Sequence, residues 1–131
     1  MKILDSDHCV AILRGQLDLE NRIRPDEEVG ITSISVGELA HGVHKSKHVA
    51  DNLTRLDVLL SVLTILAYDE AAARRFGQLK AELEQTGEVV SDLDLQIASI
   101  ALEQHSSLVT HNQAHFNRLA GKAGLRLEDW L

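Results

Sequence analysis

Short apolar runs alternate along this chain with segments whose hydrophobic residues recur at helical spacing. The runs have the length and the composition of buried strands. Strands that alternate with helices predict an α/β fold with a parallel sheet, and no repeat or internal boundary interrupts the pattern. The predicted strands cover residues 2–4, 29–33, 62–67, 108–110 and 125–127.

Polar residues that can cap a helix precede several helical segments. Their side-chain oxygens can accept hydrogen bonds from N–H groups that the first helical turn leaves free. A serine followed three residues later by an acid forms a capping box. Glycines at positions 15 and 87 predict where two helices end. The predicted caps are Asp7, Ser35 with Glu38, Asp69, and Ser91 with Asp94.

The composition limits the kind of core and the compartment. The 131 residues are enough for one domain, over residues 1–131, that buries roughly two thirds of the surface of its unfolded chain. Aromatic residues make up only 3% of the chain, so the core must be aliphatic and stacking platforms for single-stranded nucleic acid are lacking. The single cysteine, Cys9, cannot form an internal disulfide, and the N-terminal stretch has no long apolar segment. We expect a cytoplasmic protein without a membrane span.

The formal charge of −7 argues against non-specific binding to nucleic acid or to an anionic membrane, since both need a basic face. It does not exclude a nuclease. Carboxylates that bind divalent cations add to the negative count, and the bound metal partly offsets them.

Three acids far apart in the sequence are predicted to share one edge of the sheet. Asp5 follows the first strand, Glu38 lies in the first turn of the helix after the second strand, and Asp94 begins the helix before the fourth. All strands of a parallel sheet end at the same edge. Each acid taken singly could be only a helix cap, but capping does not require them to meet. Grouped carboxylates repel one another and favour a cation, and oxygen ligands suit Mg²⁺ or Mn²⁺ better than zinc.

Five segments in order resemble the PIN-domain ribonucleases, particularly the VapC-type toxins of prokaryotic toxin–antitoxin pairs. The resemblance covers almost the whole chain and implies a three-layer α/β/α domain with a central, mostly parallel sheet of four to five strands. The segments are LDSDHC (4–9), SISVGELAHGVHKS (33–46), SDLDLQIASIAL (91–102), LVTHNQAHF (108–116) and GLRLEDW (124–130).

The resemblance makes Asp5, Glu38 and Asp94 the catalytic and metal-binding residues. It implies a metal-dependent endoribonuclease, in which water activated by Mg²⁺ or Mn²⁺ hydrolyses a phosphodiester bond of RNA. Asp92 is an additional acid beside the third motif, and its binding of metal, directly or through water, stays open.

Three further polar side chains are expected around these acids. Thr110 and Asn112 would order water or phosphate, and Asn112 occupies a position that varies in the family between acid and amide. Asp7 stands where the first motif usually has asparagine, which leaves the number of metal ligands open.

Basic and histidine side chains near the motifs have two interpretations each. The basic residues could contact RNA phosphates or could be solvated surface; they are Arg14, Lys45, Lys47 and Arg118. A histidine ladder follows Glu38 at helical spacing, at His41, His44 and His48. Such a ladder could hold zinc, but no second helix offers a matching pair, and we interpret it as an exposed polar face.

The resemblance also implies a homodimer and a cognate antitoxin that blocks the acidic groove. A helix with Leu53, Leu56, Leu59 and Leu60 is a candidate surface for either contact, although core packing explains this stripe equally well.

Two other functions remain open. One is a catalytically silent PIN-like binding module. The other is an aspartyl-phosphate phosphatase, suggested by LDSD but disfavoured because no lysine follows the fourth strand and there is little room for a cap domain.

Overall fold

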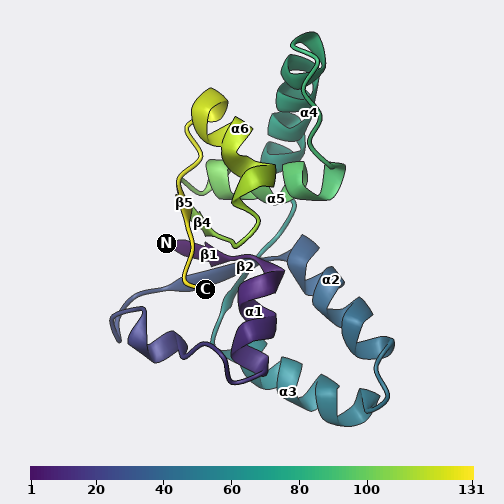
Figure 1. Cartoon of the computed structure of the whole chain (residues 1–131), viewed down its shortest axis with the longest axis vertical. Coiled ribbons are helices and arrows are strands. Elements are labelled where there is room, and N and C mark those ends of the chain that lie inside the picture. Colours follow the sequence, from purple (N-terminus) through teal and green to yellow (C-terminus); the bar gives the residue numbers. More distant parts are fainter.

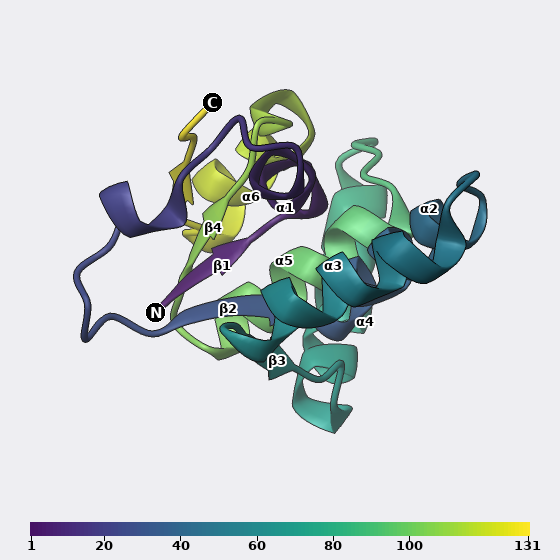
Figure 2. The ribbon, with the colours of Figure 1, turned by 90° about the horizontal axis from the view of Figure 1, so that it is seen from below.

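A five-stranded sheet forms the centre of the computed structural model, which describes residues 1–131 (Figure 1). The strand order is β3-β2-β1-β4-β5, and every neighbouring pair is parallel. Figure 2 shows β1 between β2 and β4. The strands are β1 (Lys2–Leu4), β2 (Val29–Thr32), β3 (Thr64–Leu66), β4 (Ser107–Val109) and β5 (Leu127–Glu128). The prediction of a parallel α/β sheet with up to five strands is confirmed.

Helices cover both faces of this sheet, so the three-layer architecture is also confirmed (Figure 1). One aliphatic core lies between the sheet and α1, α2 and α3, and the other lies under α4, α5 and α6. The helices are α1 (Ser6–Leu13), α2 (Ser33–His44), α3 (Val49–Ser61), α4 (Glu70–Gln85), α5 (Asp92–Glu103) and α6 (Gln113–Ala123), with a short 3₁₀ turn, η1 (Leu19–Asn21). No helix has both the length and the apolar character needed to cross a membrane.

The central strand β1 supplies both cores. Ile3 and Leu4 are fully buried, and Leu4 belongs to the core under α1 while Ile3 belongs to the core under α5. This division follows from the strand, in which successive side chains point to opposite faces. Leu108 and Val109 of β4 divide in the same way. The paired strands β1 and β4 therefore contribute side chains to the hydrophobic cores on both faces of the sheet.

Four of the five strands differ from their expected bounds, and β4 lies one residue earlier, at Ser107–Val109, than the predicted 108–110. The second strand ends at Thr32 because Ser33 already begins α2, and β3 starts late because the N–H group of Leu63 still bonds to Leu60 at the end of α3. The last strand starts at Leu127, because the N–H group of Leu125 bonds to Leu119 of α6.

Two predicted helix caps are wrong. Asp5, not Asp7, is the N-cap of α1, and its Oδ1 accepts from the N–H group of Ser6 at 2.8 Å. Thr32, not Ser35, is the N-cap of α2, since its hydroxyl oxygen accepts from Ser35 N–H at 3.1 Å. Asp5 is the residue immediately after β1, and Thr32 is the last residue of β2, so each cap lies where a strand passes into a helix. Glu38 therefore lies in the second turn of α2, not in the first.

The other predicted helix ends are confirmed. Ser91 caps α5 by accepting from Asp94 N–H at 3.3 Å, and Asp69 caps α4 by accepting from Ala72 N–H at 2.9 Å. Gly87 follows α4 with a φ of +71°, a left-handed conformation that glycine adopts without strain.

Candidate active site

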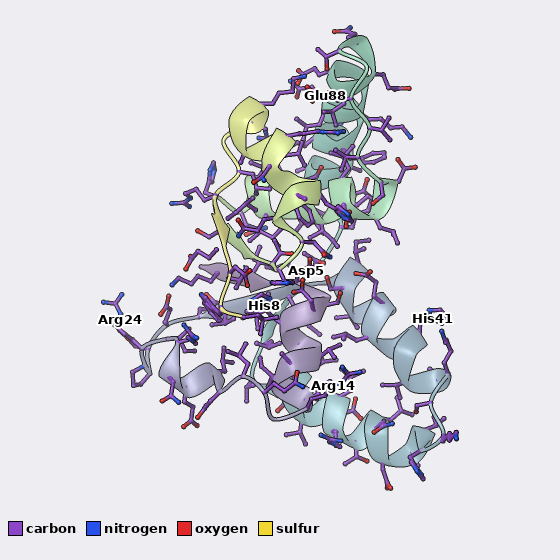
Figure 3. All side chains as sticks on the ribbon, in the orientation of Figure 1. Asp5, His8, Arg14, Arg24, His41 and Glu88 are labelled. Carbon is purple, nitrogen blue, oxygen red and sulfur yellow. The ribbon has the colours of Figure 1, made fainter.

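An acidic cluster lies where β1 and β4 end and α1 and α5 begin. Its members are Asp5, Asp7, Glu38 and Asp94, whose charges act on one another: Asp7 and Asp94 each raise the pKa of Asp5, and all three aspartates raise that of Glu38. Figure 3 shows Asp5 between the two helical layers, at the end of α1 that faces the centre of the molecule. The sequence-based expectation that residues 5, 38 and 94 share an edge agrees with this geometry.

Asp5 is the most buried member of the acidic cluster, with 4% of its surface exposed. Its Oδ2 accepts from the Thr110 hydroxyl at 2.7 Å, while its Oδ1 caps α1. Burial is the largest cause of a raised pKa at Asp5, and the two hydrogen bonds oppose that rise without cancelling it. A carboxylate that is costly to ionise and fixed at both oxygens is a good candidate for binding a cation.

Glu38 and Asp94 are more open. Glu38 is exposed on α2, and the partial burial of its carboxyl group, followed by the charges of Asp5 and Asp94, raises its pKa. Oδ2 of Asp94 lies 3.2 Å from Nδ1 of His115 on α6. Both carboxyl groups are accessible to a ligand that enters from solvent.

A shallow pocket of about 270 Å³ adjoins Asp94. Its polar lining combines this carboxylate with two groups that can carry positive charge, His115 and Arg118. One Arg118 nitrogen donates to the carbonyl oxygen of Val89 at 2.6 Å, which holds the guanidinium at the pocket wall. Other N–H groups of the guanidinium remain free to donate to a ligand. Of the four predicted phosphate contacts, only Arg118 lies beside a member of the acidic cluster.

The donor set of the acidic cluster fits a hard divalent cation. Its ligands are carboxylate oxygens, which Mg²⁺ and Mn²⁺ prefer. No three His, Cys, Asp or Glu side chains are drawn together into a closed cage. Mg²⁺ does not need one, because it usually keeps several waters and takes one or two carboxylates from the protein. An open group of carboxylates is therefore compatible with a water-bridged ion.

Three contacts hold the carboxyl group of Asp7. Its Oδ2 accepts from the N–H group of His111 at 2.9 Å and lies 3.4 Å from the Thr110 hydroxyl, and its Oδ1 lies 2.7 Å from Nδ1 of His8. Burial alone would raise the pKa of Asp7, but the hydrogen bonds from His8 and His111 outweigh it and lower the pKa. Asp7 is thus a tethered carboxylate within the cluster.

Thr110 and Asn112 lie on the same edge as the acids. Thr110 is fully buried, and besides donating to Asp5 it accepts from the N–H group of Asn112 at 3.1 Å. Asn112 is exposed and occupies the N-cap position of α6, but its side chain makes no capping bond there. The amide group of Asn112 is therefore not committed to the helix.

Several predicted residues are not brought to the acidic cluster. Asp92 pairs with Lys80 of α4 at 2.9 Å and is exposed. Arg14 lies at the opposite end of α1 from Asp5 (Figure 3). Lys45 ends α2, two helical turns beyond Glu38. The exposed histidines of the predicted polar face are His41, His44 and His48.

Sequence reasoning missed His8. This residue is fully buried next to the cluster, and its Nε2 accepts from the backbone N–H group of Trp130 at 3.0 Å. The only signal in the sequence was a histidine inside the LDSDHC segment, directly after the unexpected Asp7.

The sequence model of the PIN domain matches residues 2–122, and the chain belongs to the PIN-domain family. It is similar to the ribonuclease VapC2 of Rickettsia felis, with 34% identity over 98% of this chain and 96% of the relative. It is also similar to the tRNA(fMet)-specific endonuclease VapC of Shigella flexneri, with 32% identity over the same shares of the two chains. Among solved structures, it resembles a DNA-bound VapBC from Salmonella typhimurium, with a TM-score of 0.89, 32% identity, and coverage of 99% of this chain and 98% of the other.

Proposed function

We propose that this protein is a divalent-metal-dependent endoribonuclease and the toxin of a toxin–antitoxin pair. The observation that carries the proposal is the meeting of Asp5, Glu38 and Asp94 at one edge of the sheet, where burial and then the charge of Asp94 raise the pKa values of Asp5 and Glu38. Relatives that span nearly the whole chain are named ribonucleases and endonucleases, which supports the same chemistry.

In this proposal Asp5 and Asp94 hold Mg²⁺ or Mn²⁺, with Glu38 as a third ligand, directly or through water. When bound, the ion would polarise a phosphate oxygen and lower the pKa of a water molecule. The Thr110 hydroxyl keeps the Asp5 carboxylate in one orientation. Glu38, which is open to solvent and has a raised pKa, is suited to orient the attacking water and to accept its proton.

RNA would reach the acids from the side of the pocket beside Asp94. Arg118 is the proposed phosphate contact, because its guanidinium stands at the pocket wall and can donate to phosphate oxygens. Asn112 supplies an uncommitted amide on the same edge. The proposal gives Arg14 and Lys45 no part in contacting the cleaved bond, since each sits at the far end of its helix.

The proposed partners are a cognate antitoxin and a second copy of the chain. Leu56 and Leu59 belong to the core, so the leucine stripe of α3 is mainly internal. Val58 of the same helix and Val62, its C-cap residue, are nevertheless exposed, and both line a groove of about 1100 Å³ against α1 and the turn η1. This apolar surface is available for a protein contact. VapBC complexes among the structural relatives support pairing with an antitoxin.

Cleavage assays with the purified, antitoxin-free protein test the proposal. The substrates are initiator tRNA, chosen because the Shigella relative is named for it, together with an elongator tRNA, ribosomal RNA and a messenger RNA. Each is incubated with Mg²⁺, with Mn²⁺ and with EDTA. We expect metal-dependent internal cleavage of at least one RNA.

Three variants locate the activity. Asp5→Asn and Asp94→Asn should abolish cleavage, while Asp92→Asn should retain it, because Asp92 is turned to Lys80. Asp92 lies on the same helix turn as Asp94 and is thus a matched control. A folded wild type that cuts none of these RNAs with either metal would instead indicate a PIN-like binding module.

A further inference from the structure

His8 makes two different hydrogen bonds through the two nitrogens of one buried ring. Its Nε2 lies 3.0 Å from the backbone nitrogen of Trp130, whose N–H group can only donate, and 3.5 Å from Oδ1 of Asp129, which is too long for a good hydrogen bond; the geometry therefore makes Nε2 the acceptor, without a proton. The ring proton is therefore on Nδ1, which donates to Oδ1 of Asp7 at 2.7 Å. The ring is neutral, oriented, and inaccessible to solvent.

The bond to Asp7 begins a chain of contacts that reaches Asp5. With Oδ1 held by His8, the other oxygen of Asp7 faces the His111 N–H group at 2.9 Å and the Thr110 hydroxyl at 3.4 Å. Thr110 in turn donates to Asp5 at 2.7 Å. His8 thus contacts Asp7 directly and is linked to Asp5 through Asp7 and Thr110. It makes no hydrogen bond to Glu38 or Asp94, the acids that face solvent.

The bond to Trp130 ties the same ring to the C-terminal segment. Trp130 packs edge-on against His8, with ring centroids 6.1 Å apart. Next to it, Oδ2 of Asp129 lies 2.9 Å from Nδ1 of His111, the residue whose N–H group also holds Asp7. Through Trp130 and Asp129, the segment after β5 therefore contacts His8 and His111, the two residues that hold Asp7.

We infer that His8 is a positioning residue for the proposed metal site. Its hydrogen bond holds the Asp7 carboxylate against Thr110 and His111. Held there, Asp7 supports Asp5 through Thr110 and does not act as a metal ligand. The inference rests on the proposed function. A histidine that only fills the core would need neither the hydrogen bond to Asp7 nor a fixed tautomer. Replacing such a histidine would change metal binding only through the loss of packing.

Two substitutions separate the two bonds of the ring. The amide nitrogen of His8→Asn falls near the position of Nδ1 and can still donate to Asp7, but the side chain is too short to accept from Trp130. The amide oxygen of His8→Gln reaches toward the position of Nε2 and can accept from Trp130, but the donor to Asp7 is lost. Both variants lose the ring, and because Asn is the smaller of the two, lost packing alone would impair His8→Asn at least as much as His8→Gln.

Mn²⁺ affinity, measured by titration calorimetry on the metal-free full chain, is the decisive readout. We expect His8→Gln to weaken Mn²⁺ binding about 10-fold, the lower end of the loss that follows removal of a group supporting a metal ligand, because His8 acts on Asp5 through Asp7 and Thr110; His8→Asn should weaken it much less. Urea unfolding should show similar losses of stability in both. His41→Gln, an exposed histidine on α2, is the control and should change neither quantity. Equal affinities of the two His8 variants would overturn the inference.

A measurement on the wild type keeps the test independent of variant folding. Nitrogen-15 NMR of the histidine rings should show His8 neutral with its proton on Nδ1, and a proton on Nε2 would overturn the inference. A wild type that neither binds Mn²⁺ nor cuts RNA would refute the proposed function and remove the metal site that the inference concerns. A wild type that does both, beside a His8→Gln variant with unchanged affinity, would overturn the inference alone.

Discussion

The Thr110 hydroxyl donates a hydrogen bond of 2.7 Å to Oδ2 of Asp5, joining the ends of β4 and β1 across 105 residues of sequence. Both residues are buried, and the bond orients the carboxylate that the proposed mechanism uses to hold a cation. Because the two strands pair directly in the sheet, the position of this bond is fixed by the fold itself.

Thr110→Val should lower both metal affinity and RNA cleavage about 10-fold, since the carboxylate loses the group that orients it. The substitution keeps the shape of the side chain but leaves Oδ2 of Asp5 and the Asn112 N–H group each without a partner. We expect a loss of about 1–3 kcal/mol in the free energy of unfolding. Thr110→Ser retains the hydroxyl and should behave nearly as the wild type; an equally impaired serine variant would contradict the role of this bond.

Asp5→Asn should stabilise the metal-free protein at neutral pH by about 0.5–2 kcal/mol while abolishing cleavage, as expected where a site is built at the expense of stability. The folded-state pKa of Asp5 lies above that of the unfolded chain, mainly through burial. The folded state therefore binds more protons between these two pKa values, and the free energy of unfolding falls as the pH rises through that window. This cost arises from the ionised carboxylate, and the amide, which cannot ionise, removes it.

Urea unfolding at pH 7 in EDTA, for the wild type and Asp5→Asn, measures this difference. Added Mn²⁺ should reverse the order, because at about 100 times its Kd a ligand stabilises the protein that binds it by about 2.7 kcal/mol. A less stable Asp5→Asn in EDTA would show that the hydrogen bonds of this carboxylate outweigh its burial.

The order of the strands, the helices other than α6, and the shared edge of the acids could be predicted, because they follow from hydrophobic spacing and the rules of parallel sheets. The caps of α1 and α2 could not, since the cap is decided by the residue at which the backbone turns from extended to helical. Asp5 and Thr32 have extended backbones, with ψ of 163° and 151°, and this made them caps ahead of Asp7 and Ser35. The contact of His8 with Trp130 spans 122 residues and leaves no local pattern. The α6 helix was not predicted, as only Phe116 and Leu119 mark its buried side.

Cys9 should resist thiol reagents in the folded protein. It is fully buried, and burial, aided by the negative charges of Asp5 and Asp7, raises the pKa of its thiol to about 12, so that almost no thiolate is present at pH 8. Ellman's reagent should therefore react slowly with the native protein and rapidly in 6 M guanidinium. Rapid labelling of the native protein would argue against Cys9 as a core residue.

Ile100→Ala should cost about 2–5 kcal/mol of the free energy of unfolding, because the side chain is 1% exposed and its removal leaves a cavity in the interior. Ile65→Ala is the matched control, since Ile65 of the edge strand β3 is 51% exposed and should lose under about 1 kcal/mol. Urea denaturation of both variants gives the comparison. Similar losses would mean that Ile65 is covered in solution, as it would be at an interface between two copies of the chain.

Arg118→Ala should raise the KM for RNA about 10-fold or more, because a hydrogen bond from a charged group contributes about 1.5–3 kcal/mol. The guanidinium also holds the carbonyl oxygen of Val89, so Arg118→Lys is included to separate charge from that local contact. Arg14→Ala removes the same charge from the far end of α1 and should leave KM within about twofold at 150 mM salt, where distant surface charges are screened. Equal effects of Arg118→Ala and Arg14→Ala would mean that the RNA responds to the overall charge of the protein, and that the pocket beside Asp94 is not a phosphate-binding position.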